Sequence, residues 1–285
     1  MLSVLIPVYN YDISSLLNAV QKQCTEAGIA YEILIGDDAS VIPLNYNNKQ
    51  CRTITNNVNK GRTATRLILA KEATYDILLF LDADVMPADG NFINRYLPYL
   101  ENKPVVFGGY TYSKTHPGAQ KSLRYAYGLA REQRTAARRQ ADPFNVFSGN
   151  LLIQKKVFFE CNPVEATGYG LDILFSYNLY QKGIEPVHID NPIIHLGLED
   201  NEVFLAKALE SVARRKQWLN SEPGLADINS LCRHYLLLKN SGTAPFIAWL
   251  FTTFDKALRK RFLKEKPSLR AFDLYRLGYM CSLKN

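Results

Sequence analysis

Short apolar runs alternate with helix-patterned segments through the first hundred residues, and this alternation constrains the fold most. The apolar runs cover residues 3–9, 31–36, 51–56 and 76–81. Helical spacing follows the first run and recurs over residues 61–73. Such alternation predicts an α/β fold with a mostly parallel central sheet flanked by helices. In such sheets ligands bind beyond the carboxyl ends of the strands.

Acidic residues directly follow two of these predicted strands. Asp37 and Asp38 follow one strand, and Asp82 and Asp84 follow another. Carboxylates beside a buried segment cost free energy unless a cation or a hydrogen-bond donor meets them. Because alternate strand residues point the same way, Asp82 and Asp84 are expected to reach one cation. Mg²⁺ and Mn²⁺ prefer such oxygen ligands, although a pair of solvated loop acids is the simpler alternative.

The pattern changes in the second half of the chain. Extended runs cover residues 105–112 and 144–154, and between them residues 118–140 predict one long helix with arginines on one face. Two short extended segments lie within residues 183–197, and only helices are predicted after that. We therefore expect an α/β domain over residues 1–200 and a C-terminal helical region over residues 201–285.

Composition narrows the classes of partner and compartment. Lysine and arginine exceed the acids by 34 to 27, which suits anionic ligands, but no basic-aromatic motif for nucleic acid is present. Five scattered cysteines without a C-x-x-C pair indicate a reducing compartment. The longest apolar run outside the strands has only twelve residues and is too short to span a bilayer. A cytoplasmic protein is expected, with peripheral contact at the inner face of the membrane as an option.

Four segments together resemble a known family. They are "SVLIPVYN" (3–10), "EILIGDDAS" (32–40), "NKGRTATR" (59–66) and "LLFLDADVMP" (78–87). In order and spacing they resemble the nucleotide-sugar half of the family 2 glycosyltransferases, which have the GT-A (Rossmann-like) fold. The resemblance implies a nucleotide-sugar half over residues 1–100 and an acceptor half over residues 101–200. One departure is Leu67, where the family usually has Asn.

The resemblance also implies the site residues that hold the donor. A nucleotide sugar would contact Pro7, Val8, Tyr9, Asp38, Arg62, Asp82 and Ala83. Asp84 would hold a divalent cation, Mn²⁺ or Mg²⁺, on the diphosphate. His195, in "PIIHLG", occupies a place where some GT-A enzymes present a histidine to the metal, although a lone histidine is more often structural. His188, in an apparent strand, is expected to be structural.

The catalytic base is implied by a motif further along the chain. "GYGLDILFSYNLYQKG" (168–183) is similar to the family's G-x-x-E-D-x-D-L-x-x-R-L-x-x-x-G. The usual Glu-Asp pair is Leu171-Asp172 here, so only Asp172 carries over as the general base. An aspartate at a helix start can also be a simple cap. The preceding "FSGNLLIQKKVFFE" (147–160) resembles the segment whose small-residue turn lies near the donor sugar.

The resemblance implies a metal-dependent, inverting transfer of a sugar from a nucleotide diphosphate to an acceptor hydroxyl. Because "RRKQW" (214–218) is not the Q-x-x-R-W motif of processive synthases, single addition to a glycan or lipid-linked acceptor is expected, as in surface polysaccharide biosynthesis. Two alternatives stay open. One is a non-catalytic nucleotide-binding protein on the same fold. The other is a haloacid-dehalogenase-type phosphatase, which usually has its D-x-D on the first strand.

The C-terminal region contains a segment with two possible interpretations. "FIAWLFTTFDKALRKRFLKEK" (246–266) joins an apolar stripe to a basic cluster between Lys256 and Lys266. It could lie on anionic lipid as an interfacial helix. Alternatively, it could pack on the rest of the protein with a solvated basic edge.

Overall fold

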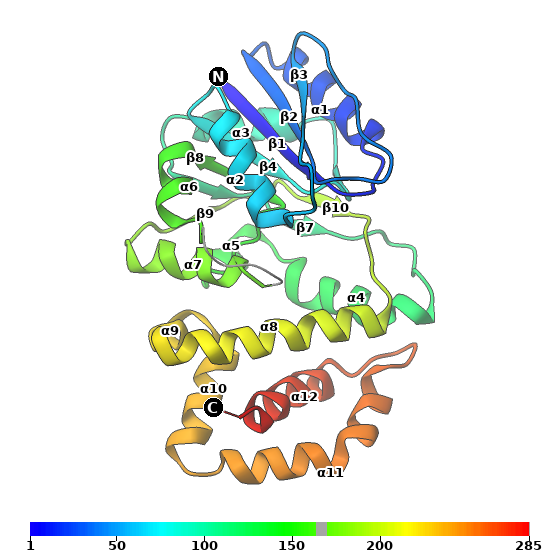
Figure 1. The fold of residues 1–285 in the computed structure, drawn as a ribbon, viewed down its shortest axis with the longest axis vertical. Coiled ribbons are helices and arrows are strands. Elements are labelled where there is room, and N and C mark those ends of the chain that lie inside the picture. The colour runs from blue at the N-terminus through cyan, green and yellow to red at the C-terminus, as the bar shows by residue number, and fades with distance from the viewer. Residues whose placement is uncertain (164–169, 285) are drawn as a thin grey trace. The chain divides into compact units, whose positions relative to one another are not determined.

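The computed structural model describes residues 1–163 and 170–284 (Figure 1). The chain divides into two compact units. Residues 1–113 and 132–197 form the first unit, and residues 114–131 and 198–285 form the second. The domain boundaries expected at residues 100 and 200 stay predictions.

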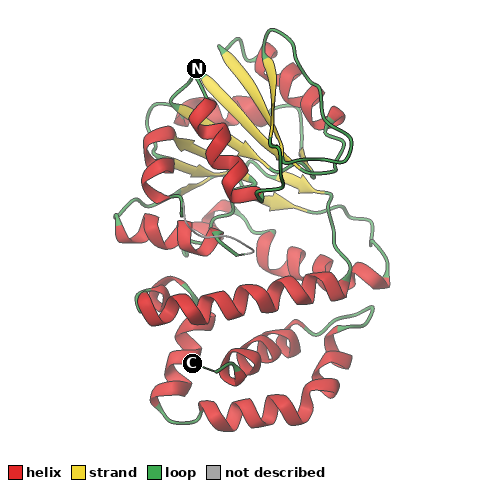
Figure 2. Ribbon diagram, in the orientation of Figure 1, coloured by secondary structure: helices red, strands yellow, loops and turns green. Residues whose placement is uncertain are grey.

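A seven-stranded sheet, built from described residues, forms the centre of the first unit (Figure 2). Its strands are β1 (Leu2–Val8), β2 (Tyr31–Asp37), β3 (Cys51–Thr55), β4 (Ile77–Leu81), β6 (Val105–Phe107), β8 (Asn150–Gln154) and β9 (Val187–His188). The order is β3-β2-β1-β4-β8-β6-β9, and every pair is parallel except those of β8 with β4 and β6. The predicted α/β class with a mostly parallel central sheet is confirmed.

The strands nearest the N-terminus are apolar because both of their faces are covered. All seven residues of β1 are buried. Helices α1 (Ser14–Glu26) and α2 (Arg62–Glu72) belong to this part of the unit, and α2 packs on β1 and β2. A Cβ at Gly36 would lie 2.6 Å from Thr65 Cγ2, so only glycine in β2 lets α2 approach this closely. This packing brings the first turn of α2 to the carboxyl end of the sheet.

A second, smaller sheet lies beyond the end of β4. It contains β5 (Val85–Pro87), β10 (Ile193–His195) and β7 (Tyr110–Thr111), with β10 in the middle. β10 pairs with β5 in antiparallel register, so His195 lies opposite Val85. The backbone N–H of Leu196 donates to the carbonyl of Asp84 at 2.8 Å. This pairing brings together two segments more than one hundred residues apart in the sequence.

The prediction of a single helix over residues 118–140 is wrong. The segment forms η2 (Ala119–Lys121), α4 (Ser122–Tyr127), a π-helical turn η3 (Gly128–Glu132) and, after a break, α5 (Ala136–Gln140). The break coincides with a contact to a distant part of the chain, because the Gln133 side chain accepts the N–H of Tyr112 at 3.1 Å. Thr135 then caps α5 by accepting the N–H of Arg138. The arginines predicted on one helix face are therefore divided between the two units.

Two predicted strands are shorter than expected. The run at 105–112 is divided by Gly108 and Gly109 into β6 and β7, which belong to different sheets. Gly109 has φ of 90°, and a Cβ at Gly108 would lie 2.4 Å from Tyr96 Oη. In the predicted run at 144–154, the strand β8 begins only at Asn150.

A short helical segment follows β5. It comprises α3 (Phe92–Tyr96) and the 3₁₀ turn η1 (Leu97–Tyr99). Asn91 occupies the N-cap position, while the Asp89 carboxylate accepts the N–H of Asn91 at 2.9 Å. Asp89 also pairs with Arg95 at 2.8 Å.

His188 is a buried structural residue, as the sequence suggests. Its Nδ1 accepts from Arg139 Nε at 3.4 Å, so Nε2–H donates to the carbonyl of Pro143 at 2.8 Å. Burial lowers the pKa of His188, and the Arg139 guanidinium lowers it further, although Asp142 and the Pro143 carbonyl oppose the shift. The imidazole is therefore neutral in the folded protein at neutral pH.

This lowered pKa predicts acid sensitivity. As the pH falls below about 6.5, the unfolded chain takes up a proton on His188 that the folded protein does not. The free energy of unfolding is therefore expected to fall between about pH 7 and pH 5. His188→Asn should flatten this decrease in urea unfolding curves recorded across the range. His234→Asn, at an exposed position, is the matched control and should keep the wild-type slope.

The second unit consists of helices. Its elements after α4 are α8 (Asn201–Ser221), α9 (Leu225–Ile228), α10 (Ser230–Asn240), α11 (Ala244–Phe262) and α12 (Leu269–Ser282). Its core contains Leu123, Phe204, Leu205, Phe262, Ala271, Phe272 and Tyr275. α11 and α12 pack closely, since a Cβ at Gly278 would lie 2.7 Å from Phe251 Cβ. Within the described residues, no helix has the length and apolar character needed to cross a bilayer.

Candidate active site

The two aspartates at the end of β2, Asp37 and Asp38, hold the loops around the carboxyl end of the sheet. Asp38 Oδ1 accepts from Asn56 Nδ2 and the N–H of Lys60, and Oδ2 accepts the N–H of Gly61, all at 2.8 Å. Asp38 therefore fixes the turn that begins α2. Its predicted contact with a nucleotide stays a prediction.

Asp37 has a similar role on the other side of the strand end. Its carboxylate accepts the N–H groups of Ser40 at 2.9 Å and Leu44 at 3.0 Å. Burial raises the pKa of Asp37, but hydrogen bonds from Ser40 and Leu44 outweigh burial and lower it overall. Asp37 is therefore an ionised anchor for the loop after β2.

The end of β1 presents one side chain to solvent. Pro7 and Val8 are buried within the strand, whereas Tyr9 is exposed. The chain then turns at Asn10, which has φ of 50° and whose Oδ1 accepts the N–H of Val41 at 2.8 Å. Of the three residues predicted here for donor binding, Tyr9 is the one whose ring is accessible.

Two arginines from α2 lie at the centre of the site. Arg62 and Arg66 are one helical turn apart and face the same side. The Arg66 side chain is only 4% exposed, whereas that of Arg62 is 45% exposed. Arg62 was predicted from the sequence. Arg66 lies in the same "NKGRTATR" segment, but the resemblance to the family implies no site role for it.

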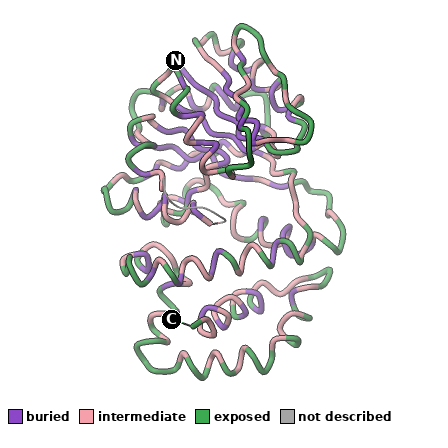
Figure 3. Tube along the Cα trace, in the orientation of Figure 1, coloured by how far each residue is buried: buried purple, intermediate pink, exposed green. Residues whose placement is uncertain are grey.

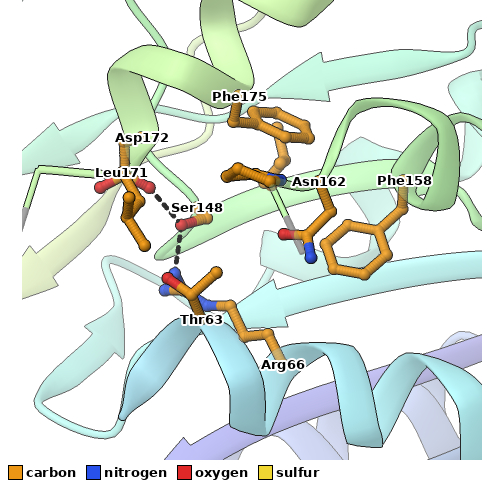
Figure 4. A pocket seen from close by; sticks show the side chains of 10 residues that line it. Thr63, Arg66, Ser148, Phe158, Asn162, Leu171, Asp172 and Phe175 are labelled. Atoms are coloured by element: carbon orange, nitrogen blue, oxygen red, sulfur yellow. Dashed lines mark hydrogen bonds between the residues drawn. The ribbon is translucent and has the colours of Figure 1, made fainter. Parts of the chain in front are cut away.

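These arginines complete a closed ring of interactions with two carboxylates and one hydroxyl. Arg66 donates through Nη2 to Asp82 Oδ1 and through Nη1 to Ser148 Oγ. The Ser148 hydroxyl donates to Asp172 Oδ1 at 2.6 Å. Arg62 Nη2 lies 3.2 Å from Asp172 Oδ2, and its Nη1 lies 3.4 Å from Asp82 Oδ2. Figure 4 shows Ser148 between Arg66 and Asp172.

Asp172 is held by this ring rather than used as a helix cap. It is the first residue of α7 (Asp172–Gln181), and Leu171 occupies the N-cap position. Both of its carboxylate oxygens have partners outside the helix, Ser148 and Arg62. Asp172 also lies at the N-terminal, positive end of the α7 dipole. Residues 168 and 169 of the same motif lie outside the described residues.

Leu171 stands where the usual glutamate would be and is buried beside Asp172. Leu171 is 5% exposed and lines a small pocket with Leu151, Phe158 and Phe175 (Figure 4). The same pocket is also lined by Arg66, Ser148 and Asp172 itself, so Leu171 lies where apolar and polar side chains meet. The orientation of Asp172 is set from the opposite side, by the Ser148 hydroxyl and the Arg62 guanidinium.

Asp82 is ionised in its buried position. Burial raises its pKa, but the charges of Arg66 and Arg62 outweigh burial and hold the pKa below its ordinary value. Nearby, burial and the Asp82 charge raise the pKa of Tyr110 well above its ordinary value, so its hydroxyl stays neutral. A Cβ at Gly149 would lie 2.1 Å from Tyr110 Oη and 2.3 Å from Asp82 Oδ2. The glycine therefore leaves the room that these two groups fill.

Asp84 has a different environment from Asp82. β4 ends at Leu81 and residues 82–84 form a turn before β5, so strand alternation does not orient the two carboxylates as predicted. Asp82 faces the arginines, while Asp84 Oδ2 lies 3.5 Å from His195 Nε2. Burial raises the pKa of Asp84 and the Asp82 charge adds to this, against the opposing effect of His195.

The Asp84–His195 pair fits a divalent cation as a partial ligand set. A carboxylate oxygen and an imidazole nitrogen at this separation can serve one ion. A Cβ at Gly197 would lie 1.8 Å from Asp84 Oδ2, so glycine keeps the space beside the carboxylate. No cluster of three or more His, Cys, Asp or Glu suited to a metal occurs in the described part of the chain. A cation bound to this pair would need further oxygen ligands from outside the chain.

The sequence model of glycosyl transferase family 2 matches residues 3–160, which is more than half of the chain. The chain belongs to this family. The match runs from β1 to α6 (Lys155–Cys161) and includes the ring residues Arg62, Arg66, Asp82 and Ser148. Asp172 and His195 lie beyond it. No curated protein sequence matches the chain.

One solved structure with a TM-score above 0.5 has a similar fold. The mannosyltransferase PcManGT from Pyrobaculum calidifontis, in complex with GDP-Man and Mn²⁺, has a TM-score of 0.54 at 13% identity. That comparison covers 99% of this chain and 85% of PcManGT. TarS residues 1–349 from S. aureus has a TM-score of 0.46 at 15% identity, covering 98% of this chain and 89% of that one. At 13% identity the likeness to PcManGT supports the fold alone, and the likeness to TarS is too weak to support any inference.

Proposed function

We propose that this family 2 glycosyltransferase is a metal-dependent inverting enzyme that moves a sugar from a nucleotide diphosphate to an acceptor hydroxyl. The observation that carries the proposal is the closed ring, which holds the Asp172 carboxylate beside the end of the sheet where the D-x-D aspartates lie. A base fixed from two sides is suited to general base catalysis, because its proton-accepting oxygen has a defined position.

In this mechanism Asp172 accepts the proton of the acceptor hydroxyl. The acceptor oxygen forms a bond to the anomeric carbon as the bond from that carbon to the diphosphate oxygen breaks. One displacement from the opposite face inverts the anomeric configuration and releases the nucleoside diphosphate. No covalent intermediate on the protein is required. Ser148 and Arg62 keep the Asp172 carboxylate oriented while the proton is transferred.

The donor would lie against the carboxyl ends of β1, β2 and β4. Its proposed contacts are Pro7, Val8, Tyr9, Asp38, Arg62, Asp82 and Ala83. Tyr9 offers an exposed ring, which suits stacking on a base. Asp38 already accepts three hydrogen bonds, so we expect it to shape the pocket through the loop it holds.

Asp84 and His195 would hold Mn²⁺ or Mg²⁺. When bound, such a cation offsets the negative charge that develops on the leaving diphosphate. PcManGT, a structure of the same fold, contains Mn²⁺ and GDP-Man. We propose that the acceptor is a glycan or a lipid-linked molecule and that the product belongs to surface polysaccharide or glycan biosynthesis.

The phosphatase alternative is not retained, because the chain belongs to a glycosyltransferase family and its D-x-D follows the fourth strand of the chain. The non-catalytic alternative on the same fold makes a different prediction for Asp172 variants, since nucleotide would bind but no sugar would be released from it.

Thermal unfolding with nucleotide sugars, with and without Mn²⁺, tests the donor and metal assignments. A ligand at about 100 times its Kd stabilises the folded state by about 2.7 kcal/mol, so a rise in Tm of roughly 5–10 °C is expected with the correct donor and Mn²⁺. Asp84→Asn should lose the part of this rise that depends on Mn²⁺. Asp76→Asn, at an exposed position, should keep it. If no nucleotide sugar raises the Tm, the donor site is wrongly assigned.

A further inference from the structure

Helix α11 has one face that packs and one face that does not. On the inner side, the rings of Phe251 and Phe262 lie 4.9 Å and 5.1 Å from the ring of Tyr275 in α12. On the outer side, Phe246 and Trp249 are 58% and 55% exposed. Figure 3 shows that much of this helix is exposed, in contrast to the buried positions of α12.

The exposed aromatic residues form a defined apolar patch. The rings of Phe246 and Trp249 stack on each other, with centroids 5.8 Å apart and planes inclined by 25°. Phe254, about two turns after Phe246, is 50% exposed. Single exposed apolar residues are common on soluble proteins, but three large aromatic rings on one helix are not accounted for by the packing of this unit.

Basic residues continue the same face toward the C-terminal end of α11. Trp249, Lys256 and Lys260 follow at intervals of seven and four residues, so they share one side of the helix. Lys256, Lys260 and Arg261 are all exposed. We name this surface, formed by Phe246, Trp249, Lys256, Lys260 and Arg261, the α11 outer face.

The α11 outer face carries no compensating acid. The one acidic residue of the helix, Asp255, accepts the Tyr275 hydroxyl at 2.6 Å on the inner side. Arg259 pairs with Glu202 in α8 at 3.2 Å. Within the described residues, Lys256, Lys260 and Arg261 form no ion pair with an acid. Their charges are therefore available to an anionic partner.

We propose that the α11 outer face binds the surface of an anionic lipid bilayer. Aromatic rings followed by basic side chains along one exposed helix face match the two components of interfacial binding, apolar insertion and attraction to acidic headgroups. The chain carries a net charge of +7, which favours approach to such a surface. The helix would lie along the bilayer, because no described helix is suited to span one. This inference does not rest on the proposed transferase mechanism.

The charge component is tested with vesicles of phosphatidylcholine containing about one-third phosphatidylglycerol, measured by co-sedimentation. Each basic residue near an anionic surface contributes about fivefold in binding, so Lys256→Gln/Lys260→Gln/Arg261→Gln should bind about 100-fold more weakly. Wild type should bind pure phosphatidylcholine vesicles at least about tenfold more weakly than the anionic ones. Lys22→Gln/Lys71→Gln/Lys103→Gln removes the same charge from exposed positions of the first unit and should change binding by less than about threefold.

The apolar component is tested by Phe246→Ser/Trp249→Ser, for which we expect at least a tenfold loss of vesicle binding, based on about 1.5–3 kcal/mol for each large side chain buried. Val203→Ser/Leu274→Ser alters two exposed apolar residues on α8 and α12, and should bind as wild type does. In a Trp218→Phe background, emission from Trp249 should shift to shorter wavelength on anionic vesicles as the ring leaves water.

Three results would overturn the proposal. The first is wild-type protein that does not bind anionic vesicles. The second is vesicle binding that stays at the wild-type level in both α11 variants. An equal loss of vesicle binding in the charge control and in the α11 charge variant would count in the same way. The third is a wild-type dimer, seen by light scattering, that Phe246→Ser/Trp249→Ser converts to a monomer without any vesicle binding by wild type. That last result would assign the α11 outer face to a second copy of the chain.

Discussion

Asp172→Asn is expected to lower the release of nucleoside diphosphate from a sugar nucleotide by about 10²–10⁴-fold, the range typical for loss of a general base. The substitution keeps the size of the side chain and an oxygen that can accept the Ser148 hydroxyl. It removes the group that would take the acceptor proton. Because Asp172 is assigned to the reaction and not to the donor pocket, the affinity for the nucleotide should change by less than about threefold.

Two further variants serve as controls for the turnover of Asp172→Asn. Asp76→Asn is the same chemical change at an exposed position and should keep wild-type turnover. Ser148→Ala leaves the carboxylate in place but removes one of its two holding groups, so a smaller loss than that of Asp172→Asn is expected. Equal, low turnover in wild type and Asp172→Asn, with nucleotide still bound, would instead support a non-catalytic nucleotide-binding protein.

The central sheet could be predicted because its inner strands β1 and β4 are mostly apolar and buried. The seven residues of β1 are all buried and are apolar from Val4 to Val8, and β4 is buried from Leu78 to Leu81, so both strands appear in the sequence as apolar runs. The acids that follow these runs also identified the end of the sheet where the site lies. These are local signals, which one sequence carries in full.

The broken helix between residues 118 and 140 could not be predicted in the same way. Its helical spacing is real, since α4 and α5 both form within it. What interrupts it is a contact made at a distance, because Gln133 bonds to the backbone of Tyr112 and draws the chain into the first unit. The helical spacing of apolar residues within a segment gives no information about such a contact with a distant residue.

The sequence also could not predict which residues of the site contact one another. Arg62 and Asp172 are 110 residues apart, and Arg66 and Ser148 are 82 residues apart. A motif can identify such residues singly but does not say which of them touch. For Arg66 a signal was present, because it shares the buried face of α2 with Leu69 and Ala70. A cation on a buried helix face indicates a buried anionic partner, and Asp82 is that partner.

Arg66→Met is expected to lower the free energy of unfolding by about 3–5 kcal/mol, because it leaves the Asp82 carboxylate buried with its main cationic partner removed. Methionine keeps much of the length and apolar contact of the arginine stem. Urea unfolding monitored by circular dichroism measures the change. Arg52→Met is the matched control, since its pair with Glu72 is about half-exposed on both sides and should contribute less than about 1 kcal/mol.

The double variant Arg66→Met/Asp82→Asn separates stability from function. Removing both charges of a buried pair is often close to neutral, so much of the stability lost in Arg66→Met should return. Turnover should not return, because Ser148 loses its arginine partner and the donor loses Asp82. A double variant that is stable and inactive would show that the Arg66–Asp82 pair is needed for turnover and not only for stability. If Arg66→Met alone unfolds within 1 kcal/mol of wild type, Asp82 is not held by Arg66 as described.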